Sequence, residues 1–142
     1  LVKIVSRGGN FLLNIGPGPN GDFDPVAYER LKDIGDWMKV NSQGIYESQP
    51  IAPYSSDNIF FTQNKKSKAI YAYYLAGENE KILPATVTIK NFKVAKGSKL
   101  SIFGSTAKLK WTVDGDGIKI NIPAKLQQNP PAQNAWCFVI QP

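Results

Sequence analysis

Residues 8–17 read Gly-Gly-Asn-Phe-Leu-Leu-Asn-Ile-Gly-Pro, and the centre of this stretch, residues 11–15, is a short and almost wholly apolar run. Such a run is typical of a strand buried on both faces in a parallel sheet. A parallel strand pairs with a neighbour reached through a crossover, and the sequence offers no such neighbour. We therefore predict that residues 1–48 are the closing βα unit of a larger domain, with residues 1–6 as the remnant of an earlier helix.

A helix is predicted shortly after this run. Residues 16–21 are rich in Gly and Pro and form the connecting loop. Asp24 is a favourable N-cap, and Pro25 suits the first helical position. Apolar residues then recur at helical spacing over residues 27–38, which predicts one buried stripe. We expect the helix to end near Val40–Asn41, before Gly44.

From residue 51 onward the apolar period changes to two, which is the period of a half-buried strand. Several short alternating segments are separated by turn-forming residues, and no helical pattern interrupts them. This arrangement predicts an antiparallel β-sandwich over residues 51–142 that contains no helix. The expected strands are residues 58–62, 69–75, 85–90, 100–103, 109–113, 118–122 and 136–140.

The composition excludes several kinds of chemistry. The chain has 142 residues and no histidine, so Ser/His and Cys/His dyads and the commonest metal ligand are absent. Its one cysteine, Cys137, lies in an apolar strand and is interpreted as a small core residue. No apolar run approaches the roughly 20 residues that span a bilayer. The chain starts mid-element without Met, so we expect the true N-terminus to lie elsewhere.

The positive charge is unevenly distributed. Residues 1–57 hold five basic and seven acidic groups (−2), and residues 58–142 hold twelve Lys, no Arg and four acidic groups (+8), which together give the net +6. The lysines alternate with apolar residues along the predicted strands, as on the solvated face of a sheet. Base and phosphate recognition favours Arg. We therefore expect neither a nucleic-acid nor a membrane partner.

Two short motifs resemble ligand-binding loops but favour structural roles. Residues 16–21 lie between a strand and a helix, yet two prolines remove N–H donors and no Lys follows, which argues against a phosphate site. Residues 114–117 read Asp-Gly-Asp-Gly, but the oxygen ligands that complete a calcium loop are missing after them. An Asp-Gly pair between two apolar strands predicts a hairpin turn. No metal or cofactor is expected.

Residues 8–17 resemble the last barrel strand of the α-L-fucosidases in family 29 of the glycoside hydrolases, where a Gly-Gly-Asn-aliphatic-Leu-Leu-Asn-aliphatic-Gly-Pro run recurs. The likeness continues through the predicted helix and its exit and, less specifically, through the predicted sandwich. It covers nearly the whole chain. The similar segments are residues 29–31, 34–35, 37, 39–41, 44–46, 104, 109–111, 116–118, 122–123 and 135–138.

The resemblance implies the end of a (β/α)8-like barrel over residues 1–48, followed by an all-β antiparallel sandwich over residues 51–142, and so a mixed fold class. It implies that the parent protein is a retaining exo-glycosidase that removes terminal α-L-fucose from oligosaccharides or glycoconjugates. The nucleophile Asp and the acid/base Glu would lie upstream, so the segment alone is expected to be inactive. Its partner would be the missing barrel portion. A secreted or periplasmic bacterial location is expected.

Asn14 is the one polar residue near the C-terminal end of the predicted buried strand, the end at which barrels place their active sites. It could hydrogen-bond at or behind the sugar pocket, or its amide could tie down the following loop. None of the eleven Asp and Glu residues ends a buried strand, so no acid/base pair is assigned in this chain.

The aromatic residues leave a second function open. A carbohydrate-binding sandwich that works without catalysis would present a row of exposed aromatic side chains on one sheet. Aromatic residues at alternate strand positions are more often part of a core. The residues in question are Trp37, Trp111, Trp136, Tyr71, Tyr73 and Tyr74.

Overall fold

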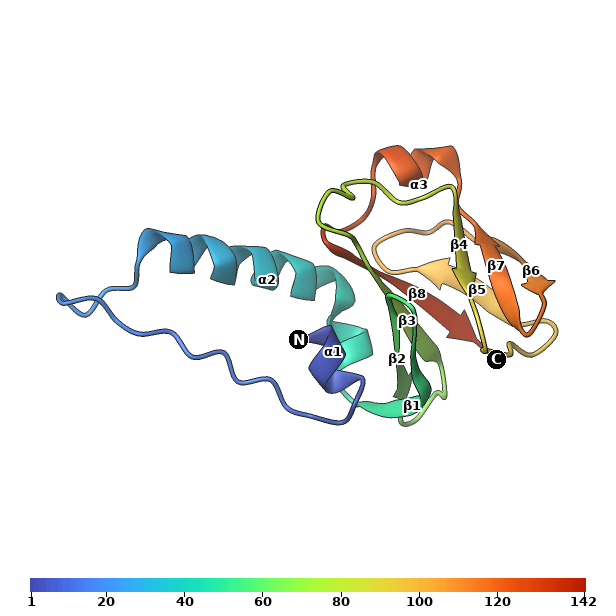
Figure 1. The fold of residues 1–142 in the computed structure, drawn as a ribbon, viewed down its shortest axis with the longest axis horizontal. Coiled ribbons are helices and arrows are strands. Elements are labelled where there is room, and N and C mark those ends of the chain that lie inside the picture. Colours follow the sequence, from blue (N-terminus) through green and yellow to red (C-terminus); the bar gives the residue numbers. More distant parts are fainter.

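The computed structural model describes residues 1–142 and consists of a two-sheet body from which one long helix projects (Figure 1). Two helices precede the first strand, and a short third helix lies between the last two strands. The elements are α1 (Val2–Val5), α2 (Pro25–Ile45), β1 (Ser48–Ser56), β2 (Ile59–Asn64), β3 (Ile70–Leu75), β4 (Thr86–Ile89), β5 (Lys99–Ile102), β6 (Lys110–Asp114), β7 (Gly117–Asn121), α3 (Ala124–Gln128) and β8 (Ala135–Gln141).

Helix α2 begins where the sequence predicts but ends later. The Asp24 carboxylate accepts a hydrogen bond from the backbone N–H of Val26 at 2.8 Å. The expected end near Val40 is wrong, because α2 continues for about one more turn. Tertiary contacts hold this turn, since the hydroxyl of Thr62 on β2 donates to the carbonyl oxygen of Gly44 at 2.8 Å. A strand thus satisfies one of the carbonyls that a helix end leaves unpaired.

The predicted buried strand over residues 11–15 does not form in this chain. Residues 9–24 contain no helix or strand and run out beneath α2 before returning to its start (Figure 1). The side chain of Leu12 is 90% exposed. The reason is the one that the sequence indicates: a parallel strand needs a neighbour, and every strand pair in the structure is antiparallel.

The remaining strands form the predicted antiparallel sandwich. A five-stranded sheet has the order β1-β2-β3-β8-β5, and a three-stranded sheet has the order β4-β7-β6. All seven predicted strands are present, and two elements were missed. Strand β1 contains two prolines and a register shift between Pro50 and Ser55, features that are tolerated because it lies at the sheet edge. Helix α3 contradicts the expectation that residues 51–142 contain no helix.

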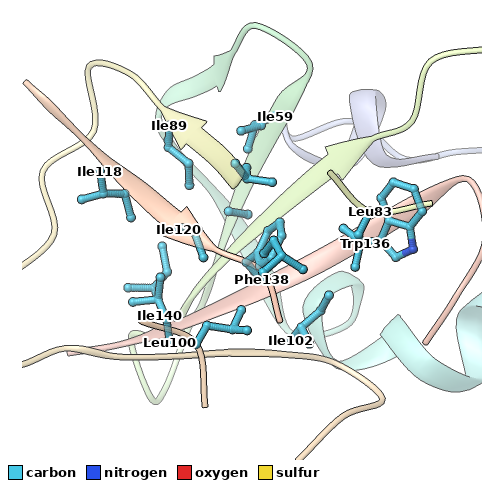
Figure 2. Close-up of a cluster of buried hydrophobic side chains, with 14 of the residues drawn as sticks. Ile59, Leu83, Ile89, Leu100, Ile102, Ile118, Ile120, Trp136, Phe138 and Ile140 are labelled. Atoms are coloured by element: carbon cyan, nitrogen blue, oxygen red, sulfur yellow. The ribbon is translucent and has the colours of Figure 1, made fainter. Parts of the chain in front are cut away.

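The main core lies between the two sheets (Figure 2). Alternate residues of each strand point inward, as in β7, where Ile118 and Ile120 are buried while Lys119 between them is exposed. The predicted solvated lysine face is confirmed there. In the larger sheet the opposite face is buried as well, because α1 and α2 pack on it through a second cluster. Cys137 belongs to this second cluster, which confirms that it is a core residue.

Residues 114–117 form the predicted hairpin turn. Asp114 pairs with Gly117 across the ends of β6 and β7, and Gly115 has a φ of 59°. A glycine with positive φ at the first central position is the pattern of a type II′ turn, which suits the twist of the flanking strands.

The C-terminal half of α2 approaches the larger sheet most closely at Gly44. A Cβ atom at this position would overlap with the hydroxyl group of Tyr73 on β3. Tyr73 is fully buried, and its hydroxyl group has no hydrogen-bond partner. Burial raises the pKa of Tyr73 far above its usual value, so the phenol stays neutral. The close contact between α2 and the larger sheet therefore requires a glycine, which has no side chain, at position 44.

We expect the Gly44→Ala variant to lower the free energy of unfolding by about 1–3 kcal/mol, because the added methyl group overpacks the contact with Tyr73. The matched control is Gly35→Ala in the same helix, where nothing lies within 4 Å of the added Cβ. That change should stabilise by up to about 1 kcal/mol, since alanine favours helix. Urea unfolding of both variants measures the difference. Equal midpoints would show that α2 does not depend on close packing at this position.

Candidate functional site

The first 34 residues carry most of the large apolar side chains that remain exposed. More than a third of each residue's surface is accessible, and the residues lie on α1, on the segment that connects it to α2, and on the N-terminal half of α2. Soluble monomers rarely leave this much apolar surface uncovered without an interaction partner. The set, here called the uncovered apolar residues, comprises Ile4, Phe11, Leu12, Leu13, Phe23, Val26, Tyr28, Leu31 and Ile34.

Some of the uncovered apolar residues line a groove of about 910 Å³. Ile4, Phe11 and Ile34 contribute to its walls, together with Trp37 and the loop at residues 131–135. The groove thus lies between the two N-terminal helices and the connection that leads into β8. No helix in the structure combines the length and the apolar character needed to cross a bilayer.

Asn14 lies on the exposed segment that leads from α1 to α2, and its amide makes no hydrogen bond within the chain. The following loop is closed by its own backbone, with the Gly18 N–H donating to Asp22 at 2.6 Å and the Gly21 N–H to Gly18 at 3.0 Å. The loop therefore does not need the Asn14 amide. A role for Asn14 at a sugar pocket stays a prediction.

The carboxylates are spread over the surface rather than paired. Nine of the eleven are exposed, and no group of three or more His, Cys, Asp or Glu side chains could hold a metal ion. The two that are half-buried have structural partners. Glu80 accepts a hydrogen bond from the Tyr74 hydroxyl at 2.8 Å, and Asp36 accepts from Lys32 at 2.6 Å and Lys39 at 2.7 Å. The hydrogen bonds and ion pairs of the carboxylates are made with lysine, arginine, hydroxyl and backbone N–H groups, and none of them joins two carboxylates.

The hydrogen bonds from Lys32 and Lys39, with the attraction of the two positive charges, lower the pKa of Asp36 to about 2. All three side chains lie on the exposed surface of α2. The lowered pKa of Asp36 therefore results from a charge cluster that stabilises the helix, and it does not indicate a catalytic acid.

The aromatic residues are mostly core, as the alternating positions suggest. Tyr71, Tyr73 and Trp136 are buried. All three tryptophans donate their indole N–H to backbone carbonyl oxygens: Trp37 to Ala135 at 2.9 Å, Trp111 to Ser98 at 3.1 Å and Trp136 to Ala132 at 2.8 Å. Trp37, Tyr74 and Trp111 are half-buried and pack against the two core clusters, so these six residues do not form an exposed aromatic row.

Two family models match the chain. Residues 1–43 match the family described as Alpha-L-fucosidase, and residues 53–141 match the one described as Alpha-L-fucosidase C-terminal domain. Tissue α-L-fucosidase of Rattus norvegicus is 33% identical over 140 residues, and that of Homo sapiens is 34% identical over the same length. Each alignment covers 96% of this chain and 29% of the relative, so the chain spans about three tenths of the length of these proteins.

Solved structures share the fold. The α-fucosidase of Thermotoga maritima in complex with a mechanism-based inhibitor superposes with a TM-score of 0.83 at 23% identity, over 99% of this chain and 32% of that one. A GH29 α-L-fucosidase from Bacteroides thetaiotaomicron, trapped as a covalent intermediate, superposes with a TM-score of 0.72 at 21% identity over 99% of this chain and 31% of that one.

We expect the 142-residue chain to self-associate through its uncovered apolar residues and to bind the dye ANS. Replacing Leu12 and Leu31 with Gln should weaken both effects several-fold, because these side chains are 90% and 37% exposed. Val113→Gln is the matched control, since Val113 is 73% exposed but lies on β6 of the sandwich. Sedimentation and dye fluorescence measure the result. If the Val113 variant reduced association as strongly, the N-terminal residues would not be the associating surface.

We expect Asp36 to stabilise the folded state only above its own titration range. Because its folded pKa of about 2 lies below the unfolded value of 3.8, its contribution is fully present above about pH 4 and is lost as the pH falls through 2. The Asp36→Asn variant should thus be less stable than the original chain at pH 6, and the difference should disappear near pH 2. Unfolding curves at both pH values measure it. A difference that grew on acidification would contradict the assignment.

Proposed function

Because this chain belongs to the α-L-fucosidase family, we propose that it is part of a retaining exo-glycosidase that hydrolyses terminal α-L-fucose from glycans. The observation that carries the proposal is 34% identity to a tissue α-L-fucosidase along 96% of the chain. The activity would reside in a complete barrel, and the carboxylates of this chain support this division, because nine of the eleven are exposed and none lies at the end of a buried strand.

The proposed mechanism is a double displacement with two carboxylates. In such enzymes one carboxylate attacks the anomeric carbon while the other protonates the leaving oxygen, and water then releases the sugar. A covalent intermediate has been trapped in the structurally similar Bacteroides thetaiotaomicron protein, which supports a retaining mechanism. Both carboxylates would come from barrel strands other than the segment at residues 11–15.

The role proposed for this chain is to complete and brace the barrel. The uncovered apolar residues would pack against neighbouring barrel strands and helices, and residues 11–15 would then gain the parallel partner that a buried strand needs. Asn14 would stand at the end of that strand, where barrels place substrate-binding side chains. The sandwich would anchor α2 from the outside. A secreted or periplasmic location is proposed from the family resemblance and is testable by cell fractionation.

We expect a longer protein that joins this chain to a complete barrel to hydrolyse 4-nitrophenyl α-L-fucoside, and the 142-residue chain to show no turnover. Asn14→Ala in the longer protein should lower kcat/KM by about 10-fold or more, because a hydrogen bond to the substrate is worth roughly 1.5 kcal/mol. Asn20→Ala in the exposed loop is the control and should leave kcat/KM unchanged. Absence of fucosidase activity in the longer protein would overturn the proposed function, and unchanged activity of the Asn14 variant would overturn its role.

A further inference from the structure

A second hollow, lined by a different set of residues from the groove described above, has the features of a ligand site. It has a volume of about 580 Å³ and lies between the C-terminal turn of α2, the hairpin of β2 and β3, and the segment at residues 101–105. We call it the sandwich cleft. None of its lining residues belongs to the uncovered apolar residues or to the groove beside them.

The register of the larger sheet explains why the sandwich cleft exists. Tyr71 pairs with Thr62 on one side and Val139 on the other, and Val139 pairs in turn with Ser101. These four side chains therefore form one row across β2, β3, β8 and β5 on the face toward α2. Helix α2 covers the Thr62 end of the row through the hydrogen bond to Gly44 and leaves the Ser101 end open.

Aromatic and polar side chains both line the sandwich cleft. The ring of Phe103 lies 5.4 Å from that of Tyr71, which is buried, and Tyr46 is 65% exposed. Several polar side chains that line the cleft make no side-chain hydrogen bond within the chain, so their donors and acceptors are available to a ligand. They are Ser42, Gln43, Ser101 and Gln141.

The charge of the lining restricts the ligand class. No Lys or Arg lines the sandwich cleft, so an anion would find no counter-charge on its walls. The one acidic residue, Glu47, already lies 3.9 Å from Lys66. Hydroxyl and amide groups beside the exposed ring of Tyr46 suit a neutral molecule with many hydroxyl groups and apolar ring faces. A neutral oligosaccharide has these properties.

We propose that the sandwich cleft is a non-catalytic binding site for neutral oligosaccharides. The Tyr46 ring stacks on one sugar face, while the hydroxyl of Ser101 and the amides of Gln43 and Gln141 bond to sugar hydroxyl groups. This site does not depend on the proposed function, since it shares no residue with the segment that carries Asn14 and needs no carboxylate pair.

The test is a titration of the full chain with three fucose-free neutral probes, lacto-N-tetraose, cellotetraose and mannotetraose, followed by ¹⁵N-NMR. At least one probe should bind saturably with a Kd of about 1 mM or tighter and shift the amides of residues 101–105. Tyr46→Ala should weaken this binding about tenfold through loss of stacking. Ser101→Val removes a hydroxyl group from the lining but keeps a good strand former, and should weaken the binding about fivefold.

Tyr54→Ala is the matched control, because Tyr54 is 49% exposed and does not line the sandwich cleft. Its affinity should equal that of the unchanged chain. The proposal fails if none of the neutral probes binds, or if the Tyr54 variant loses as much affinity as the Tyr46 variant. It also fails if a heparin-derived tetrasaccharide binds more tightly than every neutral probe. Because the probes carry no fucose, these outcomes are independent of any fucosidase activity.

Discussion

The contact between Gly44 and Tyr73 is the constraint on which the arrangement of this chain depends. It lets the backbone of α2 lie directly on the larger sheet, and it makes that sheet a middle layer with apolar residues on both faces. The burial pattern of β8, in which six consecutive residues are buried, follows from this layering. Strands of this kind lose the simple alternation of a surface sheet and read as continuous apolar runs.

The two halves of α2 have different surroundings. Its C-terminal half is fixed by Trp37, which donates to Ala135, by Asn41, which is buried, and by Gly44. Its N-terminal half carries Tyr28, Leu31 and Ile34, which remain 37–52% exposed. One helix therefore belongs to two packing units. This chain provides one of these units, and the barrel of the proposed function would provide the other.

Much of the fold could be predicted from the sequence because local and tertiary preferences agree. The cap at Asp24, the turn at residues 114–117 and the seven alternating strands each follow from short-range chemistry. The predictions were wrong where contacts between residues far apart in the sequence determine the local structure. Strand β1 pairs despite its prolines because β2 offers an edge, and α2 extends past Val40 because Thr62 satisfies its end.

Of the two candidate sites, one could be predicted from the sequence and the other could not. The exposure of the apolar residues could be expected from the sequence. A strand that is buried in a parallel sheet becomes exposed to solvent when no neighbouring strand is present. The sandwich cleft could not be foreseen, because its lining comes from separate elements that only the register of the sheet brings together. A single sequence carries no marker for serines and glutamines that become neighbours across strands.

The shared helix also limits how the length of this region can change. An added residue in an α-helix turns everything beyond it by about 100° and moves it by about 1.5 Å. If a residue were inserted between Ile34 and Gly44, the half of α2 that packs on the sheet could stay in place. The apolar residues of the N-terminal half would then be rotated toward water. Loops such as residues 16–21 can gain or lose residues freely by comparison. Length variation among related chains should thus be concentrated in the loops, with the spacing from Leu31 to Gly44 held constant.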